Sequence, residues 1–61
     1  MVVRDFLGRK ISVGDAVVIH IPHTGMELGT VHWITPRNKV VVKISDNFMP
    51  RRAGNEVVKV N

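Results

Sequence analysis

The chain has 61 residues, of which 44% are hydrophobic, and nine lysines and arginines against five aspartates and glutamates give it a formal net charge of +4. A chain of this length forms one domain and hides only about 60% of the surface that its unfolded form exposes, which excludes a deep pocket beside a separate core. The hydrophobic content excludes a disordered tail, the absence of cysteine excludes disulfides and thiolate metal sites, and the basic balance favours polyanionic partners or an acidic protein surface.

The composition is rich in β-branched side chains, with twelve valines, five isoleucines and three threonines. Their stiff χ1 torsion suits a pleated sheet better than a helix, and no segment has the apolar spacing of an amphipathic helix. No apolar run approaches the roughly 18 residues of a membrane span. We therefore expect an all-β protein that does not enter a membrane, and the lack of cysteine favours the reducing cytoplasm as its location.

The chain opens with an edge strand predicted at residues 2–6. Gly8 then breaks the alternation and indicates a turn or bulge with positive φ. A second strand is predicted at residues 16–21, and Pro22 ends it because proline cannot donate to a ladder. One face of this strand is predicted to line the core, and it carries Val17, Ile19 and Ile21.

A third strand is predicted at residues 27–35, and neither of its faces is cleanly polar. A strand that is packed on both sides, or bent by a bulge at Gly29, has this pattern. The Pro-Arg-Asn sequence at 36–38 predicts a turn, because proline presets φ and asparagine tolerates the left-handed region. Residues 39–44 carry the strongest strand signal of the chain.

Residues 45–55 form the longest segment without a strand pattern. Phe48 and Met49 lie within it, and we expect them to fold back as a lid over one open end of the core. A last strand is predicted at residues 56–60. Five short strands separated by turn residues are typical of a small barrel, because closure removes exposed strand edges.

Three pieces of the sequence follow one another at a characteristic spacing: G-D-A-V-V at 14–18, G-T-V-H-W-I at 29–34, and the valines at 40–42. Together they resemble the KOW motif of SH3-like barrels, and the resemblance covers residues 14–44. It implies that residues 1–61 form a single five-stranded SH3-like barrel. The loop at 22–28 departs from the family pattern, because it carries Glu27 and lacks the usual cluster of lysine and arginine.

The resemblance also implies a kind of function. KOW-type domains are mostly non-enzymatic, and they bind nucleic acid or the transcription and translation machinery, so the resemblance implies a partner of this kind. The opening sequence D-F-L-G-R-K-I-S-V-G-D at 5–15 also looks like small phage-encoded barrels. That second resemblance implies a stand-alone accessory protein.

Four cations at loops and strand ends are the predicted nucleic-acid-binding residues: Arg37 and Lys39 near the Pro-Arg-Asn turn, and Arg51 and Arg52 in the long loop. An arginine guanidinium matches a phosphate bidentately, and each neutralised phosphate releases counterions. In an SH3-like strand order these two loops lie toward opposite ends of the barrel. Two separate basic loops are therefore the alternative to a single patch.

Trp33 is the only tryptophan of the chain. On the surface it would stack a nucleic-acid base, an interaction of roughly 1–3 kcal/mol per base. If Val31 points inward, however, strict alternation places Trp33 on the same face, in the core or at the barrel rim. We include Trp33 among the predicted nucleic-acid-binding residues, with the core position as the alternative.

No catalytic, metal-binding or cofactor-binding residue is predicted. His20, His23 and His32 lack an acidic or thiol fourth ligand at a suitable spacing for zinc. The five carboxylates are scattered, and no nucleophile stands at a suggestive spacing from a base.

Two functions are consistent with these patterns. The first is a non-enzymatic module that contacts RNA, DNA or a nucleoprotein machine of transcription or translation through basic loops. The alternative is a protein-interaction factor, such as a phage-encoded modulator of a host enzyme. It would use the V-V-I or V-V-V strand as an edge for β-augmentation and Phe48 and Met49 as an apolar anchor, and the high apolar content and the lack of a dense basic loop favour it.

Overall fold

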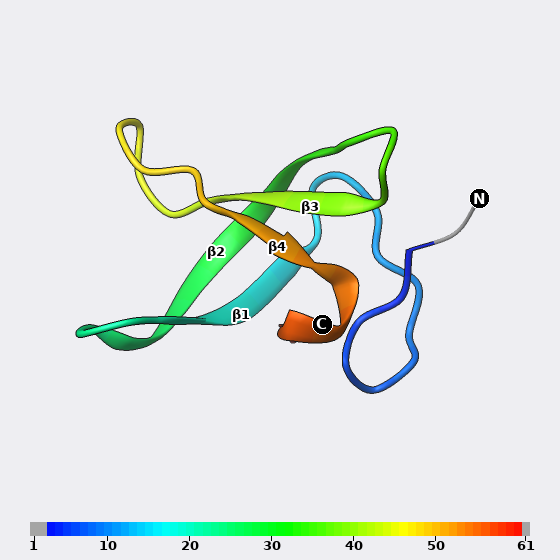
Figure 1. The fold of residues 1–61 in the computed structure, drawn as a ribbon, viewed down its shortest axis with the longest axis horizontal. Helices are drawn as coiled ribbons and strands as arrows, with labels where there is room; N and C mark the ends of the chain where they lie inside the picture. Colours follow the sequence, from blue (N-terminus) through cyan, green and yellow to red (C-terminus); the bar gives the residue numbers. More distant parts are fainter. Residues whose placement is uncertain (1–2, 61) are drawn as a thin grey trace.

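Five antiparallel strands form one curled sheet in residues 3–60, which are the residues that the computed structural model describes (Figure 1). The strand order across the sheet is β4-β3-β2-β1-β5, and a short 3-10 turn, η1, precedes the last strand. The elements are β1 (Ala16–Ile21), β2 (Gly25–Ile34), β3 (Lys39–Lys43), β4 (Arg51–Ala53), η1 (Gly54–Glu56) and β5 (Val57–Lys59).

The architecture confirms the all-β class and the five-stranded small barrel predicted from the sequence, in the form of a half-barrel. Each strand pairs with the next one along the chain from β1 to β4, and β5 returns to pair with β1. The sheet is curled (Figure 1), and the inward side chains of its strands form the core. None of the segments that the structure describes forms a helix that could cross a membrane.

The core is built from the inward face of the sheet and from the segment that precedes it. The predicted core face of β1 is confirmed, because its three residues are all buried. Valines of the other strands pack against it, and two residues of the N-terminal segment close the far side. The buried hydrophobic residues are Val3, Ile11, Val17, Ile19, Ile21, Val31, Val40, Val42 and Val57.

The strand predicted at residues 2–6 is wrong in the part that the structure describes. Arg4 forms only an isolated bridge with Lys10, and the start of the predicted strand at Val2 lies outside the described residues. The cause is Asp5, whose Oδ1 atom accepts hydrogen bonds from the backbone N–H groups of Leu7 (3.0 Å) and Arg9 (2.8 Å). These bonds fold the segment into a tight loop, because they give the backbone an alternative to a strand ladder.

Asp5 also ties this loop to the end of the chain. Its buried carboxylate accepts a hydrogen bond from the backbone N–H of Lys59 (2.8 Å) and lies 3.2 Å from a guanidinium nitrogen of Arg9. The neighbouring N–H of Phe6 donates to the carbonyl oxygen of Val57 (2.8 Å). Burial raises the pKa of Asp5, but the N–H groups of Lys59, Arg9 and Leu7 and the Arg9 charge outweigh burial and hold the pKa below its ordinary value.

The strand that was not predicted is β4, which lies in the segment predicted to be irregular. In β4, Arg51 pairs with Val41 and Arg52 pairs with Val40 of β3. Phe48 and Met49, predicted to cover the core as a lid, are instead exposed (42% each) in the turn before β4. The tight turn at 45–48, closed by hydrogen bonds between Ser45 and Phe48, turns the chain back along β3 too soon for these side chains to reach the core.

A bulge interrupts β2 near its end. Val31 pairs with Val42 and Trp33 pairs with Val41, so that His32 is an extra residue with no partner on β3. A bulge at Gly29 was one of the two explanations offered for the pattern of this strand, but Gly29 stays in register opposite Val17. A Cβ atom at Gly29 would lie 2.5 Å from Cγ1 of Val42. Glycine is therefore required here because β3 packs too closely to leave room for a side chain.

Candidate nucleic-acid interface

The outward side of β3 carries the first part of the candidate site. Val40 and Val42 point into the core and are fully buried. Because successive side chains of a strand point to opposite faces, Lys39, Val41 and Lys43 point outward, and both lysines are exposed.

The bulge at His32 brings Trp33 onto this same side. If His32 took a regular place in the ladder, alternation from the inward-pointing Val31 would turn Trp33 toward the core. Instead Trp33 lies opposite Val41, on the outward face, and is 54% exposed. Of the two positions considered for Trp33, the core position is therefore wrong and the surface position is correct.

Arg51 completes a row across three strands. Val41 has Trp33 as its neighbour on β2 and Arg51 as its neighbour on β4, and paired residues of an antiparallel ladder share a face. Arg51 is exposed. The row therefore presents an aromatic ring, an apolar side chain and a cation on adjacent strands.

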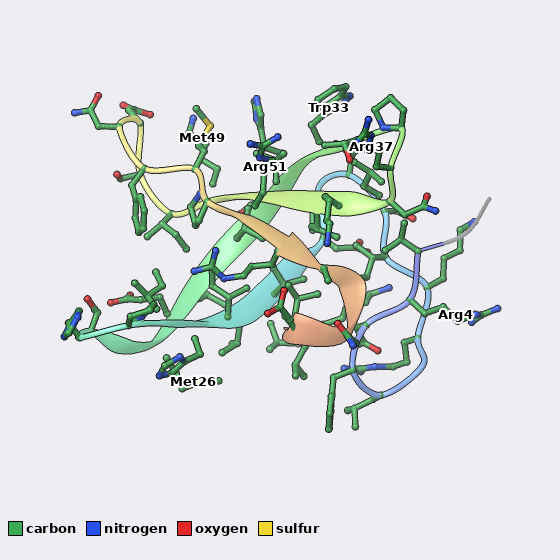
Figure 2. The ribbon with its side chains drawn as sticks, viewed as in Figure 1. Arg4, Met26, Trp33, Arg37, Met49 and Arg51 are labelled. Atoms are coloured by element: carbon green, nitrogen blue, oxygen red, sulfur yellow. The ribbon has the colours of Figure 1, made fainter. Side chains whose placement is uncertain are left out.

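Arg37 lies in the turn between β2 and β3 and is exposed. Figure 2 shows its side chain on the same side of β3 as Trp33 and Arg51. We call the surface formed by these outward residues the basic face. Its members are Trp33, Arg37, Lys39, Val41, Lys43 and Arg51.

The basic face carries little compensating negative charge. Of the ion pairs between described residues, one lies on it, between Nζ of Lys43 and Oδ1 of Asp46 at 3.2 Å. Both side chains are largely exposed (44% and 92%), and an exposed pair of this kind contributes at most about 1 kcal/mol. Asp46 therefore leaves the face with a net positive charge.

Arg52 does not belong to the basic face, although it was predicted to act with its neighbour Arg51. It pairs with the inward residue Val40 and is half-buried. Its guanidinium donates to the carbonyl oxygen of Arg51 (2.8 Å) and, at 3.5 Å, to that of His20. Adjacent residues of a strand point to opposite sides, so the two arginines cannot serve one surface.

The turn at 36–38 and the loop at 44–50 lie at opposite ends of β3, as expected from the sequence (Figure 1). Arg51 nevertheless lies beside the middle of β3, because it belongs to β4 and pairs with Val41. Lys43 was missed, and the signal for it was present in the sequence K-V-V-V-K at 39–43, whose alternation places both lysines on one face.

The predicted edges for β-augmentation are wrong. The V-V-I and V-V-V strands, β1 and β3, lie inside the sheet, and the outer strands are β4 and β5. The N-terminal loop covers β5 through the bonds of Asp5 and Phe6. Among the described strands, the open edge is therefore that of β4, next to the exposed Phe48 and Met49.

Neither a pocket nor a metal site is found in the part of the chain that the structure describes. No group of three or more histidine, cysteine, aspartate or glutamate side chains is placed to hold a metal ion among these residues, and residues 3–60 enclose no pocket. The basic face presents cations and one exposed aromatic ring.

The fold and this face define a small all-β half-barrel with a cationic, partly aromatic convex side. The chain belongs to the family described as a domain of unknown function (DUF7205), whose model matches residues 3–60. Comparison with the curated proteins finds no match, and comparison with the solved structures finds none either.

Proposed function

We propose that the protein is a non-enzymatic binding module of the cytoplasm that contacts nucleic acid, alone or within a nucleoprotein machine, through the basic face. One observation carries the proposal: Lys39, Lys43 and Arg51 project from one face around an exposed tryptophan. The net charge of +4 and the KOW-like pattern of residues 14–44 support it.

The spacing of the cations suits a chain of phosphates. Lys39 and Lys43 are four residues apart on one strand, about 13 Å at the usual rise of a β-strand. Trp33 and Arg51 are two strands apart, about 10 Å. Each lysine or arginine that neutralises a phosphate releases condensed counterions, so several such contacts give appreciable affinity at low salt and a steep loss at high salt.

A pair of charge-reversal variants tests the proposal. Binding of labelled RNA and DNA oligonucleotides is followed by anisotropy at low salt, for the wild type and for the double variant Lys39→Glu/Arg51→Glu. The matched control is Arg4→Glu/Lys10→Glu, which changes the net charge equally at two exposed positions. Figure 2 shows Arg4 away from the basic face, and Lys10 forms a bridge with Arg4. Circular dichroism confirms that both variants are folded.

We expect the double variant on the basic face to lose roughly tenfold or more in affinity and the control to lose clearly less, because direct phosphate contacts outweigh the general field. Equal losses of affinity in the two variants would show that only the net charge matters and would contradict the proposed site. Failure of the wild type to bind any oligonucleotide at low salt would contradict the function itself.

A second candidate function is favoured by a separate observation. Phe48 and Met49 are exposed beside the open edge of β4, and an apolar anchor next to a free edge suits β-augmentation by a protein partner. A phage-encoded modulator of a host enzyme would act in this way. This candidate predicts that a partner captured by the wild type is lost with Phe48→Ser/Met49→Ser and retained with Met26→Ser, and equal capture by all three would contradict it.

A further inference from the structure

Packing of the core does not explain why Trp33 is exposed. Exposing more than half of a tryptophan leaves a large apolar surface in water, and the strand does so through a bulge, a feature that re-aims side chains. Ile34, the next residue, turns back inward opposite Val40 and packs against the core. The bulge thus keeps the core contact of β2 and turns the indole ring outward.

The surroundings of the ring indicate the chemistry of its ligand. Arg37 follows in the turn, and Arg51 lies on the same row beyond Val41. Lys39 and Lys43 lie along β3 on either side of that row. A ligand resting on the ring therefore meets cations in several directions across the sheet, which suits an anionic chain that carries flat rings.

Nucleic acid offers both features, but only an unpaired strand offers them together. In a duplex the faces of the bases are covered by their neighbours, and the protein meets base edges and phosphates. In a single strand each base has a free π-face, which stacks on aromatic side chains with little regard to sequence. The ring of Trp33 can therefore stack on a base of a single strand but not on a base within a duplex.

The shape of the surface agrees with this choice. Duplex readers insert a helix or a two-stranded ribbon into a groove, whereas the basic face lies on the convex side of a sheet, and no α-helix occurs in residues 3–60. These residues also enclose no pocket that would hold and identify a flipped base. Both facts favour a single strand lying across the face, bound without strong sequence preference.

We infer that the ligand of the basic face is single-stranded nucleic acid, with one base stacked on Trp33 and the adjoining phosphates held by Arg37, Lys39, Lys43 and Arg51. This inference rests on the proposed nucleic-acid function and adds the class of substrate. It places the strand across β2, β3 and β4, and it assigns to the bulge at His32 the role of presenting the ring.

The test compares two probes and three variants. The probes are a labelled oligothymidylate of about 12 nucleotides, within the site sizes known for small barrels, and a duplex of the same length. The variants are Trp33→Ala, Trp33→Phe and, as a matched control, Leu28→Ala, which truncates another exposed outward residue of β2 (63% exposed). Tryptophan fluorescence of the wild type during titration reports on the ring directly.

We expect Trp33→Ala to weaken binding of the single strand roughly 5- to 100-fold and to leave its salt dependence unchanged, because no charge is removed. Trp33→Phe should retain most of the affinity, and Leu28→Ala should behave as the wild type. The duplex should bind more weakly than the single strand and respond little to Trp33→Ala. Fluorescence of Trp33 should change on addition of the single strand.

The outcomes separate this inference from the proposal on which it rests. If Lys39→Glu/Arg51→Glu abolishes binding but Trp33→Ala does not weaken it, or if the duplex binds as tightly as the single strand, the inference is overturned and the nucleic-acid function stands. If the wild type binds neither probe at low salt, both are overturned.

Discussion

Asp5 is buried although the residues that follow it in the sequence are exposed. Within the described residues its carboxylate accepts four hydrogen bonds, which come from Leu7, from the backbone and side chain of Arg9, and from Lys59 near the opposite end of the chain. In the sequence it looks like any aspartate before a glycine turn. Its role could not be predicted, because its most distant partner is 54 residues away.

Replacing Asp5 with asparagine should change both stability and its dependence on pH. A carboxylate whose pKa is lower in the folded than in the unfolded chain adds stability that is fully present above the unfolded pKa, about 3.9, and is lost as the pH falls through the folded pKa. Asp5→Asn should therefore lower Tm by on the order of 10 °C at neutral pH. It should also show a smaller loss of stability than the wild type below about pH 5.

Urea unfolding at neutral and acidic pH measures this difference. Asp46→Asn is the control, because the side chain of Asp46 is 92% exposed and its removal should leave both the stability and the pH profile close to wild type. An Asp5→Asn variant as stable as the wild type, or with the same acid profile, would show that the carboxylate does not hold the loop.

Gly54 is a second residue with a defined structural reason. A Cβ atom there would collide with the carbonyl oxygen of Arg4 and lie 2.8 Å from Cγ1 of Val3. The backbone of Arg4 cannot move away from this Cβ atom unless the N-terminal segment, with the buried Val3, moves out of the core. Gly54→Ala should therefore lower the free energy of unfolding by about 1–3 kcal/mol, whereas Asn55→Ala, in the same turn but exposed, should change it by less than about 0.5 kcal/mol.

At the scale of elements, the strands with a local pattern of their own were predicted and β4 was not. β1 and β3 have runs of apolar residues bounded by turn residues, which fix their position. β4 has three residues and no alternation of apolar and polar residues. It forms because its backbone pairs with the backbone of β3. Local sequence contains no signal for such a pairing, and the same is true of the contacts that fold residues 3–11 into a loop.

The candidate site shows the same division. The residue types of Arg37, Lys39 and Arg51 were sufficient to select them as phosphate contacts. The face of the sheet to which Arg52 points depends on the register of β4, and that of Trp33 depends on the bulge at His32. Both are decided by pairing between strands. The sequence therefore selected candidate residues by their type and left open which of them share a face.

The facing of β3 can be tested by a pair of substitutions on adjacent residues. Val42 is fully buried and Val41 is half-buried on the outward side. Val42→Ala should lower the free energy of unfolding by about 2 kcal/mol, and Val41→Ala by less than about 1 kcal/mol. Thermal or urea unfolding measures both, and equal losses would contradict the assignment of the two faces.

At the scale of the whole molecule, the surface divides into two unlike parts. The basic face covers the outward side of β2, β3 and β4, and Figure 2 shows Met26 projecting on the side opposite Trp33 and Arg51. On the other part of the outward surface, Leu28, Val18 and Val58 lie in register across β2, β1 and β5. Four of the nine lysines and arginines lie on the basic face with the tryptophan, where Asp46 pairs with Lys43.

This distribution predicts how binding should depend on salt. Four cations on the basic face give a slope of about −3 for the logarithm of the association constant against the logarithm of salt concentration with a single strand, at about 0.7 per neutralised phosphate. Lys39→Glu/Arg51→Glu should reduce the magnitude of the slope by about 1.4. A titration series between about 50 and 200 mM salt measures it, and a slope near zero would exclude phosphate contacts as the source of affinity.

The unpaired residue of β2 has a consequence for changes of chain length. Loss of one residue from a strand normally turns every later side chain over, which exchanges inside for outside. His32 is an exception, because it has no partner on β3 and the residues on either side of it already follow a regular in-out order. A deletion at this one position should leave Val31 inside, Trp33 outside and Ile34 inside, whereas deletion of a paired neighbour would have to be compensated. The strand can therefore lose this residue, over evolutionary time or by design, while both its core and its outer surface persist.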